Sequence, residues 1–403
     1  MTLFGISFAY LRARPFATAL NLLLLALGIA TITVLLLASA QLEERMGRDA
    51  RGIDLVAGAK GSAMQLVLSA VFHLDAPTGN IPLAEANALA KHKLVKKAIP
   101  LALGDSFRGF RIVGSNHDYP AHYGAVLAGG RLWAEPMEAV VGAEVAAKTG
   151  LAAGASFTGA HGLEGEGDAH ESTPYKVVGV LAASGAVLDR LILTSVESVW
   201  LVHEHVEAGA DPKKLLAEMD DKEKELTALL IQYASPLAAA MLPRQINSAS
   251  ALQAASPAYE SARLFRMLGV GVEVLRAFGV ILVLAAGLSV FIALLNALEE
   301  RRYDLAVMRM LGASPAKLMG LMLAEGMALA LAGGVAGVAL GHALTEALGA
   351  ALKAAQQAAV TGWAWNAGEL WLLVLALSVG VAASLVPAWR AYRTDVAPVL
   401  AEG

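Results

Sequence analysis

The chain has 403 residues, of which 57% are hydrophobic and 16% are charged, and its formal net charge is −4. An ordinary soluble domain has about 25% charged residues. The composition therefore argues against a disordered chain, a single soluble globule and a nucleic-acid-binding protein. With no cysteine, disulfides and thiolate metal sites are excluded. The sequence predicts a membrane protein.

The charged residues are unevenly distributed. Residues 41–272 contain 47 of the 66 Lys, Arg, Asp and Glu residues, and eight of the nine histidines. The rest of the chain is correspondingly apolar. We therefore expect a water-facing domain inserted into a membrane-embedded frame.

Four uncharged stretches are long enough to cross a bilayer, which requires about 20 apolar residues in a helix. They occupy residues 16–40, 277–298, 326–345 and 370–389. The first could instead be a cleaved signal peptide, but its apolar run exceeds the usual core of about 7–15 residues. We therefore predict four retained spans, at 16–40, 273–298, 318–346 and 370–389.

Basic residues near the ends of the spans predict the orientation, because they concentrate on the cytoplasmic side. Arg12 and Arg14 precede the first span, and further basic residues follow the second and fourth spans. An amphipathic helix at 1–15, the loop at 299–317 and the tail at 390–403 are therefore expected in the cytoplasm. The outer domain (41–272) and an outer loop at 347–369 lie on the other side. We predict an inner-membrane protein with both termini cytoplasmic.

The outer domain combines two kinds of pattern. Short strand candidates are punctuated by Gly, Pro, Asn or Asp, and they lie at 52–58, 107–113, 139–141, 175–180 and 190–193. Residues 85–97 and 211–233 have charged, helical patterns, whereas 161–171 and 242–262 are predicted as loops. The fold class is a membrane α-helical protein with a large α+β domain between the first and second spans.

The loop between the second and third spans has an amphipathic pattern. Leu305, Met308 and Leu311 are apolar at intervals of three, and basic residues occupy other positions. This spacing predicts a short helix ended by Gly312. Periodicity alone also fits a simple juxtamembrane anchor.

This loop resembles the signature of the FtsX-like, or MacB-like, ABC transporter permeases. The resemblance rests on residues 300–318, which read ERRYDLAVMRMLGASPAKL. The tail at 387–391 and 395–400 is also similar, although Val396-Ala397-Pro398 departs from the family ending. In the outer domain, 129–131, 140–142 and 177–180 are similar to the family's periplasmic core domain.

The resemblance implies a homodimer of this chain bound to two copies of a separate ABC ATPase, with membrane lipid around it and a periplasmic partner protein as a further option. The helix at 299–314 would be the coupling helix, and its candidate contact residues are Arg301, Arg302, Asp304, Leu305, Met308, Arg309, Leu311 and Gly312. No GxxxxGK[ST] motif occurs, so ATP is expected to bind the partner. We expect no cofactor and no catalytic residue in this chain, and no nucleic-acid partner.

The third predicted span contains small residues at intervals of four, Gly333, Gly337 and Gly341. Such a ridge allows two helix backbones to approach closely. It fits packing within the chain or a dimer interface. Glu325, at the inner end of this span, either extends to the interface or forms a hydrogen bond within the bundle.

Histidines in the outer domain suggest a metal site. His203 and His205 would share one face of a strand, and His161 and His170 flank an acidic stretch. Imidazole and carboxylate groups suit zinc. The competing interpretation is an incidental pair and a solvated loop.

The predicted function is that of a permease subunit that couples ATP hydrolysis by its partner to movement of the outer domain. This movement would drive export or extraction of a substrate, with metal-linked transport as one option. The alternative is a signalling device that activates an extracytoplasmic partner such as a cell-wall hydrolase.

Overall fold

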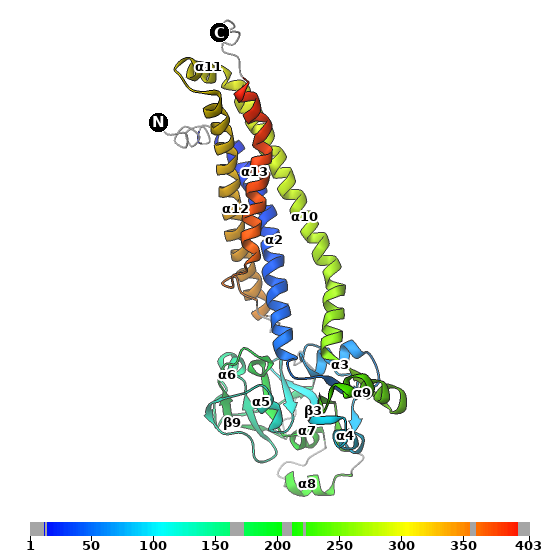
Figure 1. The fold of residues 1–403 in the computed structure, drawn as a ribbon. Coiled ribbons are helices and arrows are strands. Elements are labelled where there is room, and N and C mark those ends of the chain that lie inside the picture. The colour runs from blue at the N-terminus through cyan, green and yellow to red at the C-terminus, as the bar shows by residue number, and fades with distance from the viewer. Residues whose placement is uncertain are drawn as a thin grey trace. The chain divides into compact units, whose positions relative to one another are not determined.

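The computed structural model describes residues 12, 14–161, 173–203, 212–220, 223–354 and 360–393 (Figure 1). The chain divides into two compact units. The helical unit consists of residues 1–42 and 268–403, and the inserted domain consists of residues 43–267. This organisation confirms the predicted fold class.

The helical unit contains four helices that are long and apolar enough to cross a membrane. They are α2 (Pro15–Asp49), α10 (Pro257–Glu300), α12 (Pro315–Ala354) and α13 (Gly368–Tyr392), and the short helix α11 (Arg302–Met310) lies between α10 and α12. Both α2 and α10 continue beyond the predicted spans and contribute residues to each unit. Their extensions carry the charged residues that a bilayer core excludes.

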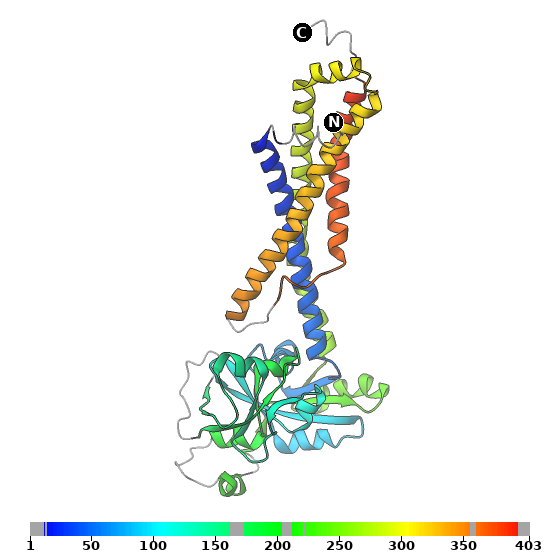
Figure 2. The same ribbon diagram turned by 90° about the vertical axis from the view of Figure 1, so that its left-hand side faces the viewer.

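Small residues allow the long helices to pack closely. A Cβ atom on Gly28 of α2 would lie 2.8 Å from the Val283 side chain of α10, and one on Gly380 of α13 would lie 2.3 Å from the Ala330 Cβ of α12. Apolar side chains of α2, α10, α12 and α13 fill the space between the helices, including Leu25, Ile29, Val283, Ala330, Leu372 and Ala376. Figure 2 shows α12 crossing α2 within this unit.

The inserted domain is built around a mixed sheet of eleven strands with the order β13-β1-β12-β3-β4-β10-β6-β9-β5, to which β7 and β8 are added beside β9 and β3. Its strands are β1 (Leu55–Ala59), β3 (Val95–Phe107), β4 (Phe110–Gly114), β5 (Leu127–Gly130), β6 (Glu138–Val141), β7 (Ser156–Phe157), β8 (Ala160–His161), β9 (Tyr175–Leu181), β10 (Leu191–Thr194), β12 (Ala228–Tyr233) and β13 (Leu252–Ala255). The pairs β4–β10 and β6–β9 are parallel, and the other pairs are antiparallel. A separate antiparallel pair is formed by β2 (Ile81–Pro82) and β11 (Glu225–Leu226).

Short helices connect the strands of the inserted domain. They are α3 (Ala63–Ala70), α4 (Leu83–Ala90), α5 (Asp118–His122), α6 (Ala143–Thr149), η1 (Val187–Arg190), α7 (Val196–His203), α8 (Pro212–Glu218) and α9 (Pro236–Ala249). One apolar cluster includes Leu55, Ile231, Leu229 and Leu242, and another includes Ile112, Val141, Val177 and Ile192. Residues from several strands meet in each cluster.

The predicted helical stretch 85–97 is helical only up to the end of α4 at Ala90, because β3 begins at Val95. Two further predictions for this domain are wrong. Residues 211–233 are helical only in α8, and the same stretch contains the strands β11 and β12. Residues 242–262 are not a loop, because they contain the end of α9, the strand β13 and the start of α10. In the first case the Lys and Glu residues preceding β12 favour a helix, whereas the apolar run that follows is buried between β1 and β3.

Candidate functional site

The segment between α10 and α12 is a short helix with a sharp turn at each end. α10 ends at Glu300, the chain turns at Arg301, and α11 runs from Arg302 to Met310. Gly312 then adopts a φ of +96°, which favours glycine. The Ala313 N–H donates to the Met308 carbonyl over 3.0 Å, so Gly312 ends the helix as the sequence predicts.

One face of α11 packs against its own chain. Leu305 and Ala306 are fully buried, and their neighbours come from α10, α12 and α13. The cluster around Leu305 contains Leu298, Leu318, Leu321, Met322, Ala388 and Ala391, with Met308 partly buried against it. The apolar face therefore fixes α11 to the ends of three long helices.

A buried ion pair stabilises the turn that precedes α11. Arg301 Nη1 donates to Glu325 Oε2 over 3.3 Å, and the two side chains are 8% and 4% exposed. Arg14 forms a second ion pair with Glu300, the residue before this turn. Of the two alternatives for Glu325, the structure shows the one with a hydrogen bond inside the bundle. The pair joins the start of α11 to α12.

The opposite face of α11 is exposed. Arg302, Tyr303 and Asp304 are exposed at its start, and Met310 and Leu311 at its end are 62% and 83% exposed. Among the predicted contact residues, Arg302, Asp304, Leu311 and Gly312 are therefore accessible, while Met308 and Arg309 are half-buried. Arg301 and Leu305 face the interior and can act only by supporting the helix.

The sequence prediction did not include two exposed residues, Tyr303 and Met310. Each of the two is next in the sequence to a predicted contact residue. Their exposure depends on how α11 is oriented against the long helices. Both lie one helical turn from the buried Ala306, so a helix wheel would have placed them near the buried side, and no signal in the sequence indicates their exposure.

The glycine ridge of α12 faces α2 of the same chain. A Cβ atom would lie 2.8 Å from the Leu25 side chain at Gly333, 2.6 Å from Ile29 Cβ at Gly337, and 2.5 Å from Thr33 Cβ at Gly341. These contacts follow successive turns of α2. The ridge therefore packs within one chain, the first of the two alternatives.

The histidine candidates do not form a described metal site. His161 lies in β8 and His203 is the last residue of helix α7 rather than part of a strand, while His170 and His205 fall outside the described residues. Within the part of the chain that the structure describes, no three His, Asp or Glu residues gather as a metal site would require. The prediction that His203 lies in a strand is wrong.

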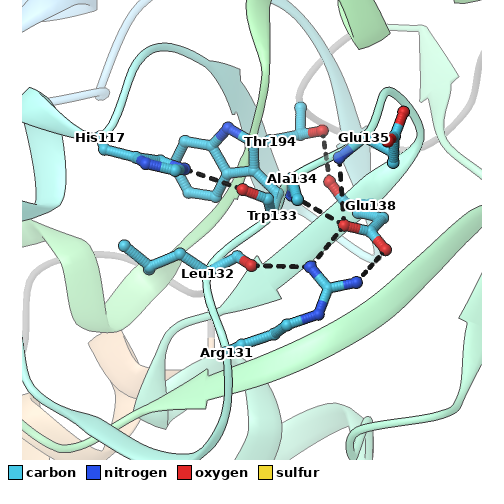
Figure 3. A network of polar contacts seen from close by, with 8 residues as sticks. All are labelled: His117, Arg131, Leu132, Trp133, Ala134, Glu135, Glu138 and Thr194. Carbon is cyan, nitrogen blue, oxygen red and sulfur yellow. Dashed lines mark hydrogen bonds and ion pairs between the residues drawn. The ribbon is translucent and has the colours of Figure 1, made fainter.

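A polar network in the inserted domain fixes the loop between β5 and β6 (Figure 3). Arg131 Nη1 donates to Glu138 Oε2 over 2.7 Å, and the same oxygen accepts from the backbone N–H of Ala134 over 2.8 Å. The Arg131 guanidinium lowers the pKa of the Glu138 carboxyl to about 2. Beside it, His117 Nε2 donates to the Trp133 carbonyl over 2.8 Å. Arg131, the last residue of the Gly-Gly-Arg sequence at 129–131, thus has a structural role in this loop.

The chain is similar to two solved extracytoplasmic domains. The similarity to the periplasmic region of MacB from Actinobacillus actinomycetemcomitans covers 55% of this chain and 96% of that structure, at 13% identity and a TM-score of 0.35. The similarity to the extracellular domain of the noncanonic ABC-type transporter YknZ from Gram-positive bacteria covers 50% of this chain and 98% of that structure. The sequence identity is 14% and the TM-score is 0.29. No curated protein sequence matches the chain.

Two family profiles match the chain directly. The MacB-like periplasmic core domain matches residues 18–248, and the FtsX-like permease C-terminal domain matches residues 276–396. The second match includes α11 and the whole of α12 and α13. The chain belongs to the family of FtsX-like and MacB-like ABC transporter permeases.

Proposed function

We propose that this chain is the permease subunit of an ATP-driven complex and that α11 is the helix that docks on the ATPase. ATP hydrolysis takes place in the partner chain, and the movement it causes passes through the long helices to the inserted domain. The result is export or extraction of a substrate at the inner membrane. Two copies of the chain act with two copies of the ATPase, and both termini lie on the ATPase side.

The two faces of α11 are the observation that carries this proposal. Its inner face is fixed by Leu305 and by the Arg301–Glu325 pair. Its outer face exposes Tyr303, Met310 and Leu311 beside charged residues. Exposed aromatic and apolar residues ringed by polar ones are typical of the centre of a protein interface. A helix held rigidly on one side and exposed on the other can pass a push on to the bundle.

The continuity of the helices supports the second half of the mechanism. α10 runs without interruption from Pro257 to Glu300, and α2 runs from Pro15 to Asp49. Since a helix transmits an axial or tilting movement over its whole length, displacement at α11 would act on the ends of α2 and α10 that enter the inserted domain. No chemistry in this chain is needed for that step.

Replacing Leu311 with Asp tests the docking. Leu311→Asp places a charge at the exposed end of α11, and we expect binding of the cognate ATPase to weaken at least about tenfold, in the range of a moderate interface hot spot. Leu311→Met is the matched control, because it retains an apolar side chain and should bind normally. The measurements are copurification with the full chain in detergent and stimulation of ATP hydrolysis.

Wild-type binding and stimulation by the Leu311→Asp variant would contradict the proposed role of α11. A variant that binds normally but no longer stimulates hydrolysis would instead place Leu311 in transmission rather than in docking. Both outcomes require that the Leu311→Met control retains full activity.

A further inference from the structure

The helical unit contains a cavity near the end that carries α11. It has a volume of 230 Å³ and lies between the start of α2, the end of α10 and α12. Its lining includes Arg14, Thr18 and Asn21 of the α2 end, Ser289 of α10, and the Arg301–Glu325 pair. A single water molecule needs about 10–15 Å³ on this measure. The space therefore accommodates a polar group much larger than water.

Asn21 is the unusual residue of this cavity. Its side chain lines the space and is only 3% exposed, yet it makes no hydrogen bond to another residue in the part of the chain that the structure describes. A buried amide offers two donors and an acceptor, and leaving them unused inside a membrane-spanning bundle is costly. A polar ligand in the cavity would satisfy them.

Arg14 is the group in the lining that can contact an anion. The charged residues are Arg14, Arg301 and Glu325, and Arg301 and Glu325 form an ion pair. Arg14 also forms an ion pair with Glu300, but a guanidinium has five N–H donors, and a single carboxylate does not occupy all of them. The first turn of α2, a helix of 35 residues, lies in the same place. The dipole of this helix favours negative charge at its N-terminus.

The exposed part of the cavity lining includes apolar side chains beside the polar Asn296. Leu20 and Ile292 belong to its lining and are 54% and 49% exposed. Further along the same two helices, Leu23 of α2 and Leu288 of α10 are 53% and 59% exposed. In a chain whose helices cross a bilayer, these side chains face hydrocarbon. An anion that enters by this route is one attached to acyl chains.

We propose that this cavity binds the phosphate diester of a membrane phospholipid, with Arg14 and Asn21 as donors and the acyl chains along α2 and α10. The bound head group lies beside the Arg301–Glu325 pair, which holds the first turn of α11. Lipid occupancy would therefore stabilise the arrangement of α11 on the bundle. The site belongs to this chain alone and does not depend on the ATPase.

Native mass spectrometry of the full chain in detergent tests the site, with phosphatidylglycerol as the probe. We expect one lipid to be retained more tightly than all others. Asn21→Leu and Asn21→Asp preserve the size of the side chain, the first removing the donors and the second adding a negative charge. Each should weaken retention at least about tenfold, and the Asp variant more.

Two controls distinguish the site from general attraction to a charged surface. Arg14→Gln should lose the lipid, whereas Arg12→Gln removes the same charge two positions away, from a residue outside the cavity lining, and should retain it. Inorganic phosphate added alone should not displace the lipid. Retention unchanged in both Asn21 variants, equal loss in the Arg12 and Arg14 variants, or equal binding of free phosphate would each overturn the proposal.

Discussion

The close packing of α12 on α2 makes a quantitative prediction for Gly337→Ala. The new Cβ would lie 2.6 Å from Ile29 Cβ and 2.8 Å from the Ala26 carbonyl oxygen. Neither atom is the end of a flexible side chain, so the two helices must separate. Overpacking of this kind costs about 1–3 kcal/mol, and two rigid contacts place the cost near the upper end of that range.

Alanine also has a higher helix propensity than glycine, which stabilises the folded helix by about 1 kcal/mol. Gly337→Ala should therefore destabilise the helical unit by about 2 kcal/mol, the difference between these two contributions. Gly320→Ala, in the same helix, is the matched control, because a Cβ there meets nothing within 4 Å. This control should be neutral or slightly stabilising.

The assay is thermal unfolding of the full chain in detergent, followed by circular dichroism at several protein concentrations. For a unit of this size, 2 kcal/mol corresponds to a decrease in Tm of about 4–8 °C. Because the ridge packs within one chain, the decrease should not depend on concentration. A Gly337→Ala variant as stable as Gly320→Ala would refute the packing argument, and an effect seen only through dissociation of dimers would favour the interface alternative.

The remaining predictions concern charged and titratable groups. Glu325→Gln leaves Arg301 without its buried carboxylate and should destabilise the helical unit by about 3–5 kcal/mol, whereas the double variant Arg301→Met with Glu325→Leu should cost less in the same unfolding assay. Burial lowers the pKa of His73 well below its usual value, so His73 remains neutral when folded and takes up a proton on unfolding below about pH 6.5. The stability of the inserted domain should therefore fall as the pH decreases from 6.5, by up to about 1.4 kcal/mol per pH unit, and hydrogen exchange of the full chain should show a smaller slope for His73→Asn. Glu138→Gln weakens the pairing with Arg131 and should speed protease cleavage in the loop between β5 and β6 without unfolding the rest of the domain; cleavage at the wild-type rate would contradict the structural role of this pair.

The membrane helices could be predicted from the sequence because their signal is long and local. A run of about 20 uncharged residues has few alternatives in water or in a bilayer. The turn at Gly312 could also be predicted from a local signal, because a backbone with positive φ at a helix end favours glycine. The extensions of α2 to Asp49 and of α10 back to Pro257 were not included, since charged residues end the apolar signal but not the helix.

The wrong predictions in the inserted domain have a common physical cause. β12 (Ala228–Tyr233) lies between β1 and β3, and its first four residues are buried. A strand covered on both faces does not alternate apolar and polar residues, so its pattern resembles that of a buried helix. Pro243 lies inside α9, where proline usually indicates a loop. In both cases tertiary packing determines the secondary structure, and the local sequence pattern does not reveal that packing.

The coupling segment shows the same limit at the level of single residues. Leu305, Met308 and Leu311 are spaced by three, and at about 100° per residue Leu311 is rotated about 120° away from Leu305. The three therefore do not share one face, and the structure separates them: Leu305 is fully buried, Met308 partly, and Leu311 is 83% exposed. Leu305 belongs to the apolar core of the chain, whereas Leu311 remains accessible. Leu311 is adjacent to the exposed Met310, and neighbouring exposed apolar side chains of this kind are what the proposed docking of the ATPase at α11 would bury.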